Sequence, residues 1–297
     1  MKKILTLFLV GLIIEGRTQD LLSLLGEDTK TQKTFLTNSF KTTRVVNSHS
    51  VEFLSPGVLD VRILHRFGTI NGGLDNLYGF DQANMRLGFD YGISKRIMMG
   101  VGRSNVNKEL DGFLKYRMIW QGTGAGSMPF SFVVVAGSTL ITMPYADPNR
   151  TNFYSSRLAY YYQVLIARKF SERLTIQLAP TVVHRNLVAE TSDKNDIYSI
   201  GFGGRFKLSK RTSFNWDYQY VLPGYLKQGY YNFFAVGFDI ETGGHVFQLH
   251  VTNSIGMNER AFITATTDNI NSMGLRLGFN LSRVFTVTHK EHQKEGR

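Results

Sequence analysis

The sequence predicts an all-β protein, a transmembrane up-and-down antiparallel β-barrel of about 12 strands with a short N-terminal periplasmic or plug segment. Apolar and polar residues alternate along runs of about 9–12 residues, the length that a tilted strand needs to cross a bilayer. Short and long connections alternate between these runs. Beyond the N-terminus, no stretch reaches the roughly 20 apolar residues of a membrane-spanning helix. Barrels with a polar interior fit a composition of 42% hydrophobic and 13% aromatic residues with 29 Gly.

The N-terminus predicts export. Lys2 and Lys3 precede an apolar run that ends at Ile14, as in a secretory signal peptide, which we expect to cover residues 1–19. A membrane anchor is the weaker alternative, because the run is short. The absence of Cys fits an exported fold without disulfides. The predicted location is the outer membrane of a Gram-negative bacterium.

Residues 20–55 form the predicted periplasmic or plug segment. The sequence Asp-Leu-Leu-Ser-Leu-Leu at 20–25 is typical of a short capped amphipathic helix, and a polar linker follows it. Residues 45–54 allow one short strand, which leaves the strand count open between 12 and 14. The pattern does not distinguish a segment in the periplasm from one inside the pore. Residues 56–285 then form the barrel, and residues 286–297 form a polar C-terminal tail.

The twelve predicted strands follow the alternation. In one of them, Leu114, Tyr116 and Met118 alternate with Lys115 and Arg117. The strands are expected near residues 58–68, 82–92, 95–105, 110–121, 130–141, 156–170, 173–185, 196–208, 211–221, 231–241, 244–254 and 271–282.

The short turns repeat a local motif of an apolar residue, Ser, a charged residue and Arg. It occurs as Ile-Ser-Lys-Arg at 93–96, Phe-Ser-Glu-Arg at 170–173 and Leu-Ser-Lys-Arg at 208–211. A turn that recurs at the period of a hairpin indicates an array of similar β-units. A soluble β-sandwich would explain the alternation, but not the confinement of the tight turns to one side. Aromatic residues near predicted strand ends, including Tyr116, Tyr162 and Tyr220, are typical of membrane-interface girdles.

A family resemblance supports this interpretation. The segments TTRVVNSHSVEF, VRILHRFGTINGG, ANMRLGFDYGISKRIMMGVGRS and DGFLKYRMIWQ within residues 40–121, and GLRLGFNLSRVF near the C-terminus, resemble an uncharacterised outer-membrane β-barrel family of Bacteroidota. The resemblance covers nearly all of the mature chain. It implies a barrel in the outer membrane and no particular activity, since the family is a domain of unknown function.

Basic residues dominate the predicted lumen. The net charge is +11, and the alternation points more cations than acids inward. Rings of Arg and Lys in a pore favour anions, although the same groups can also pair with inward acids and fill a narrow barrel. The predicted inward acids are Asp60, Asp90, Asp217 and Asp239. The predicted lumen-lining basic residues are Arg62, Arg66, Arg86, Lys115, Arg117, Arg205, Lys207 and Arg276.

The main functional hypothesis is therefore a passive pore or uptake channel for small, anionic solutes. The second is a closed structural or docking barrel that binds a periplasmic or surface partner through its N-terminal segment. A membrane-embedded hydrolase is the weakest, because His250 with Ser199 or Ser213 is a pairing that any barrel could offer.

Other chemistry is not expected. His289 and His292 have ligand-like spacing but no third ligand, so we predict no metal site and no cofactor. Export argues against nucleic acid as the partner of this basic chain. We expect the lipid of the outer membrane to surround the barrel.

Overall fold

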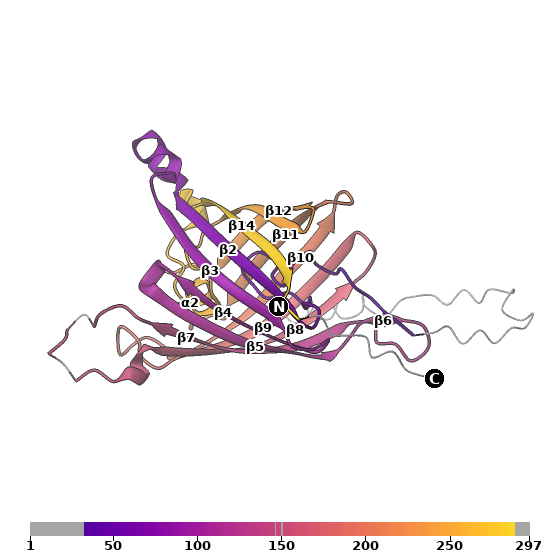
Figure 1. The fold of residues 1–297 in the computed structure, drawn as a ribbon. Helices are drawn as coiled ribbons and strands as arrows, with labels where there is room; N and C mark the ends of the chain where they lie inside the picture. The colour runs from indigo at the N-terminus through magenta and orange to yellow at the C-terminus, as the bar shows by residue number, and fades with distance from the viewer. Residues whose placement is uncertain (1–32, 146, 150, 289–297) are drawn as a thin grey trace, which may run out of the picture.

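Twelve antiparallel strands form a closed barrel in the computed structural model, which describes residues 33–145, 147–149 and 151–288 (Figure 1). The predicted signal peptide and helix at 20–25, and residues 289–297 with both tail histidines, lie outside the described residues. The strands are β2 (Val58–Thr69), β3 (Ala83–Gly92), β4 (Ile97–Ser104), β5 (Glu109–Ile119), β7 (Ser131–Ile141), β8 (Leu158–Lys169), β9 (Leu174–Arg185), β10 (Asp196–Lys207), β11 (Thr212–Val221), β12 (Phe233–Thr242), β13 (His245–Thr252) and β14 (Arg276–Thr286).

Each barrel strand pairs with its neighbours in the chain, and β14 pairs with β2 to close the sheet. Thr286 lies opposite Val58 at the end of this closing pair. A separate two-stranded sheet joins β1 (Thr34–Phe35) to β6 (Gly122–Thr123). The prediction of an up-and-down antiparallel barrel with about 12 strands is confirmed.

The alternation of the sequence separates the two faces of the wall. In β5, Leu114 and Tyr116 are 53% and 40% exposed on the outer surface, whereas Lys115 and Arg117 are buried inside. Successive side chains of a strand point to opposite faces, so one period-2 pattern provides an apolar exterior and a polar interior.

The recurring turn motif has a local explanation. In each copy the Ser hydroxyl accepts hydrogen bonds from two backbone N–H groups: Ser94 from residues 96 and 97, Ser171 from residues 173 and 174, and Ser209 from residues 211 and 212, at 3.0–3.2 Å. Ser stabilises a tight turn in this way because its side chain replaces a backbone acceptor. We call this end of the barrel the short-turn end.

The opposite end carries the long connections (Figure 1). They include the 3₁₀ segments η2 (Ile70–Gly79), η3 (Val106–Lys108), η4 (Tyr154–Arg157) and η5 (Ile270–Ser272), and the helix α2 (Glu259–Thr264). Within the described part of the chain, no helix has the length and apolar character needed to cross a membrane.

The largest error in the predicted boundaries concerns the last strand. It was expected over residues 271–282, but β14 covers Arg276–Thr286. The phase was correct, because Arg276 and Asn280 point inward and are buried. The start was wrong because Asn269 and Ser272 belong to a 3₁₀ turn of the loop that precedes the strand.

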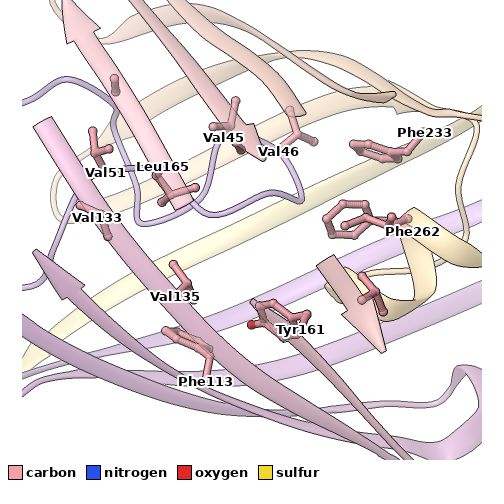
Figure 2. Close-up of a cluster of buried hydrophobic side chains, with 14 of the residues drawn as sticks. Val45, Val46, Val51, Phe113, Val133, Val135, Tyr161, Leu165, Phe233 and Phe262 are labelled. Carbon is pink, nitrogen blue, oxygen red and sulfur yellow. The ribbon is translucent and has the colours of Figure 1, made fainter. Parts of the chain in front are cut away.

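The interior is filled by side chains and by residues 38–54. Phe40, Val45 and Val51 of this segment join a buried cluster with wall residues such as Val133 and Leu165 (Figure 2). Residues 45–54 add no strand to the barrel, since a single bridge from Arg44 to His49 is the isolated pairing found there.

Glycine gives large inward side chains the space they need. A Cβ atom on Gly102 would lie 2.2 Å from a guanidinium nitrogen of Arg86, and one on Gly100 would lie 2.4 Å from a carboxylate oxygen of Asp90. Both glycines therefore relieve crowding inside the barrel.

Candidate functional site

The segment of residues 38–54, which we call the plug segment, enters the lumen and turns back within it. Residues 39 and 40 and all residues from 43 to 51 are buried. The turn is closed by hydrogen bonds from the Val45 N–H to the Ser48 carbonyl (2.8 Å) and from the Ser50 N–H to the Thr43 carbonyl (3.0 Å). The tip of the plug segment is therefore residues 45–48.

Asp217 of β11 holds this tip. One carboxylate oxygen accepts from three successive backbone N–H groups, those of Val46 (3.3 Å), Asn47 (2.9 Å) and Ser48 (2.8 Å). The other oxygen accepts from the Ser48 hydroxyl at 2.7 Å. Successive N–H groups that converge on one oxygen form a nest for an anion, and such charge-assisted bonds are stronger than neutral ones.

Neutral wall side chains satisfy three carbonyl groups at and next to the tip. Gln248 donates to the Val45 carbonyl (2.7 Å), Asn280 to the Val46 carbonyl (3.1 Å) and Gln177 to the His49 carbonyl (2.7 Å). A buried carbonyl without a partner is costly, so these three amides make the lumen complementary to this backbone path.

Basic side chains bind the plug segment nearer the short-turn end. Lys115 donates to the Glu52 carbonyl at 2.6 Å, and Arg117 donates to the Val51 carbonyl at 3.3 Å. Arg205 donates to the carbonyls of residues 38 and 39 at 2.6 and 3.1 Å. These cations therefore hold the plug segment through neutral backbone oxygens.

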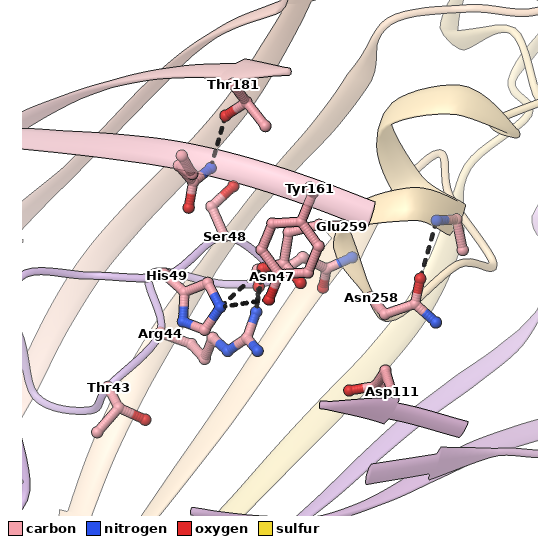
Figure 3. A network of polar contacts seen from close by, with 12 residues as sticks. Thr43, Arg44, Asn47, Ser48, His49, Asp111, Tyr161, Thr181, Asn258 and Glu259 are labelled. Carbon is pink, nitrogen blue, oxygen red and sulfur yellow. Dashed lines mark hydrogen bonds and ion pairs between the residues drawn. The ribbon is translucent and has the colours of Figure 1, made fainter. Parts of the chain in front are cut away.

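A loop from the opposite end meets the tip inside the barrel. Glu259, in α2, forms an ion pair with Arg44, and Asn47 donates to the Gly256 carbonyl at 2.9 Å (Figure 3). The Nε2 atom of His49 lies 3.0 Å from the Tyr161 hydroxyl and 3.3 Å from a Glu259 oxygen. The lumen is thus occupied from both ends.

Burial governs the charge states at this junction. It lowers the pKa of His49 well below the ordinary value, and the positive charge of Arg44 lowers this pKa further, so the ring is neutral near pH 7. Burial also raises the pKa of Glu259, and the nearby Arg44 opposes this effect. With His49 neutral, the ion pair of Arg44 and Glu259 joins the plug segment to the loop.

The predicted basic residues divide into three groups. Arg86 pairs with Asp111 at 2.5 Å, Arg62 lies 3.6 Å from Asp60, and Arg276 pairs with Asp268. These three cations have carboxylate partners. Lys207 is only half-buried, near the short-turn end.

Three of the remaining predicted residues, Lys115, Arg117 and Arg205, contact the plug backbone, as given above. The fourth, Arg66, donates to the side-chain oxygens of Asn47 (2.5 Å) and Asn280 (2.9 Å). Within the described residues, none of these four has a carboxylate oxygen within 4.0 Å.

Several contributors were not singled out from the sequence. Glu109 and Asp111 share the inward parity of Lys115 in β5, so the register could have found them. Glu109 binds Asn258 (2.5 Å) and pairs with Arg260 of the loop. Residues 44 and 259 had no comparable signal, because their positions depend on how the plug segment and a six-residue helix fold into the lumen.

The geometry offers little for catalysis or metal binding. Ser199 bonds to Gln219 at 3.4 Å, and the Ser213 hydroxyl has no hydrogen-bond partner, so neither serine is paired with His250. Among residues 33–145, 147–149 and 151–288, no group of three or more His, Asp or Glu side chains could hold a metal ion.

Several solved structures resemble the fold. The NanC porin aligns with a TM-score of 0.48 and 10% sequence identity, over 78% of this chain and 100% of NanC. The monoaromatic hydrocarbon channel CymD aligns with a TM-score of 0.35 and 9% identity, over 80% and 90% of the two chains. The toluene transporter TbuX of Ralstonia pickettii aligns with a TM-score of 0.33 and 8% identity, over 78% and 89%. No curated protein matches the chain.

The sequence itself matches a family model, described as a membrane bound beta barrel domain (DUF5777), over residues 40–285. The match begins in the plug segment and ends at the penultimate residue of β14, so it contains nearly all of the closed barrel. This chain therefore belongs to the DUF5777 family of membrane-bound β-barrels.

Proposed function

We propose that this protein is an outer-membrane channel for small anionic solutes, and that its plug segment holds the channel closed. The supporting observation is the set of four lumen cations without carboxylate partners: Arg66, Lys115, Arg117 and Arg205. They bind neutral oxygens, three of them on the plug backbone.

Displacement of the plug segment would remove the acceptors of Lys115 and Arg205. Arg66 and Arg117 would lose their plug acceptors and keep one or two neutral oxygens of the wall. A buried cation that loses its acceptor must find water or an anion. Rings of Lys and Arg that line a pore favour anions over cations. The open lumen would therefore attract anions, while the closed lumen satisfies the same groups with carbonyl oxygens.

The outer membrane is the location that this architecture favours. A closed barrel leaves no unpaired sheet edge in lipid, and barrels with short turns at one end and long loops at the other are typical of that membrane. The basic, apolar start of the chain supports export.

Planar-bilayer conductance tests the proposal. We expect the full-length mature protein to show few openings, and a variant without residues 20–54 to show discrete steps. In a KCl gradient, the reversal potential of the shortened variant should favour chloride. The double change Arg117→Gln and Arg205→Gln should reduce this preference. The matched double change Arg96→Gln and Arg211→Gln, at exposed turn positions, should leave it unchanged.

A silent bilayer would contradict the proposal if both forms of the protein are inserted. Cation selectivity of the shortened variant would contradict the anion assignment alone. Protease protection of the barrel in liposomes establishes insertion independently of the current.

A closed docking barrel is the second candidate. It is favoured by the small sheet of β1 and β6, which leaves Phe35 44% exposed beside its stacking partner Trp120, with ring centroids 4.9 Å apart. If inserted protein is silent without residues 20–54, capture of a periplasmic partner by the full chain but not by a Phe35→Ser variant would support this function.

A further inference from the structure

The lumen has two chemically different sides. Strands β2, β3 and β5 direct charged side chains inward, among them Arg62, Arg66, Arg86, Lys115 and Arg117. Strands β7–β10 direct uncharged groups inward along most of their length. Their buried inward positions include the apolar Val133, Val135, Leu165 and Val183 and the neutral polar Gln163 and Gln177.

The two sides meet where β5 pairs with β7, with Lys115 opposite Val135 and Arg117 opposite Val133. Farther from this pair they face each other across the lumen. In the twelve-strand order, β2 is opposite β9 and β3 is opposite β10. The division is therefore a property of the closed lumen, and we call its two parts the charged sector and the uncharged sector.

The plug segment matches this division. Its apolar side chains, including Val45 and Val51, belong to the cluster that contains Val133, Val135 and Leu165 of the uncharged sector (Figure 2). Its carbonyl oxygens accept from Lys115 and Arg117 of the charged sector. Near Val51 the segment thus combines apolar side chains, which join the cluster of Val133 and Val135, with carbonyl oxygens that accept from the neighbouring cations. Gln177 of the uncharged sector donates to a further plug carbonyl, that of His49.

We infer that the transported solute is an amphipathic anion, with a carboxylate-like head and an alkyl or aryl body. This inference rests on the proposed channel function and specifies its substrate class. The anionic head replaces the carbonyl oxygens at the charged sector, and the apolar body replaces the valine side chains at the uncharged sector. A small hydrophilic anion would satisfy only the first of these surfaces.

Chain length is the property that distinguishes the two kinds of solute. Full burial of one additional methylene group strengthens binding roughly fourfold. For an anion bound only by its head, the affinity should not change with chain length. We therefore expect block of the chloride current to strengthen at least tenfold from butyrate to octanoate.

The experiment uses the full chain with Asp217→Asn, which weakens the hold on the plug tip. Chloride current through planar bilayers is measured with acetate, butyrate, hexanoate and octanoate as blockers. Hexyltrimethylammonium, which carries the opposite charge on a similar chain, should not block. Bilayers without protein control for membrane effects of the longer chains.

Two sets of variants separate the two surfaces. Val135→Thr with Val183→Thr places hydroxyls in the uncharged sector and should flatten the dependence on chain length, with chloride selectivity preserved. Lys115→Gln with Arg117→Gln should weaken block by every carboxylate equally, with the chain-length dependence preserved.

The outcomes separate the two proposals. A chloride current that all carboxylates block equally overturns the amphipathic substrate and leaves the anion channel standing. A reactive thiol in a Val46→Cys variant shows that the tip has been released. If chloride still does not pass in that state, the channel function is wrong, and this inference is wrong with it. Block that strengthens with chain length and loses this dependence in the threonine variant supports the inference.

Discussion

Asp217→Asn is expected to release the tip of the plug segment. Asp217 accepts backbone hydrogen bonds from residues 46, 47 and 48. Hydrogen bonds to a charged group contribute about 1.5–3 kcal/mol, against about 0.5–1.5 kcal/mol for neutral ones. Replacement of the carboxylate by an amide should therefore weaken each of these bonds by roughly 1 kcal/mol.

For the three backbone bonds together, the loss of binding free energy between Asp217 and the tip is about 3 kcal/mol at most. Burial of a neutral amide costs less than burial of a carboxylate, and this gain offsets part of the loss. A loss of about 1.5–3 kcal/mol corresponds to a roughly 10- to 100-fold larger population with the tip released. The tip should leave the nest without unfolding the wall, since the wall strands keep their own ladder of backbone bonds.

The absence of native Cys makes the assay direct. Val46 is fully buried, so a Val46→Cys variant carries one protected thiol at the tip. We expect Asp217→Asn to raise the rate at which a maleimide modifies this thiol by about 10- to 100-fold, in proportion to the released population. Asp111→Asn is the matched control, because Asp111 is also buried but pairs with Arg86 of the wall (2.5 Å).

Equal labelling rates with and without Asp217→Asn would refute the reasoning. The plug segment would then be held by its remaining contacts, and the nest around Asp217 would contribute little to closure. An equal acceleration by Asp111→Asn would also refute it, since the effect would then follow from general loosening of the barrel.

Three further predictions concern the wall, the turns and the junction. Gly102→Ala should destabilise the barrel by about 1–3 kcal/mol through overpacking, whereas Gly112→Ala, whose Cβ would lie 3.6 Å from its nearest neighbour, should be nearly neutral in urea unfolding. Ser209→Ala removes the acceptor of two turn N–H groups and should cost about 1 kcal/mol in the same assay, and an unchanged unfolding midpoint would show that the hydroxyl is dispensable. The pKa of His49 is lowered in the folded state, so below about pH 6.5 the unfolded chain binds one more proton than the folded protein. As the pH is lowered through this range, the free energy of unfolding should decrease by up to about 1.4 kcal/mol per pH unit. His49→Gln should remove this part of the pH dependence, and identical pH profiles for the two proteins would contradict the assignment.

The barrel could be predicted from the sequence because its two determinants are local. Alternation sets the face of each side chain, and the Ser-containing turns set the ends of hairpins, so the predicted and observed strands agree within a few residues over most of the chain. The last strand was the exception, since the loop before it contains apolar residues that extend the alternating pattern without joining the sheet.

The filling of the lumen by residues 38–54 could not be predicted in the same way. The plug segment has neither a helical nor a strand period, and its place depends on partners such as Asp217 and Gln248, about 170 and 200 residues later in the chain. The inward parity of the basic residues was readable, but their acceptors were not. Alternation shows which way a side chain points and leaves open what fills the space in front of it.

The closing pair of β14 and β2 has a consequence for assembly. The plug segment directly precedes β2, and the pair that seals the wall joins the first barrel strand to the last. We therefore expect the plug segment to enter before the seam closes, because a sealed wall would leave only the two crowded ends as routes of entry. A barrel that closes around residues 38–54 places the plug segment and completes the wall in one folding event. If the plug segment closes the channel as proposed, the barrel is already closed when it is first inserted, and no leak accompanies its folding.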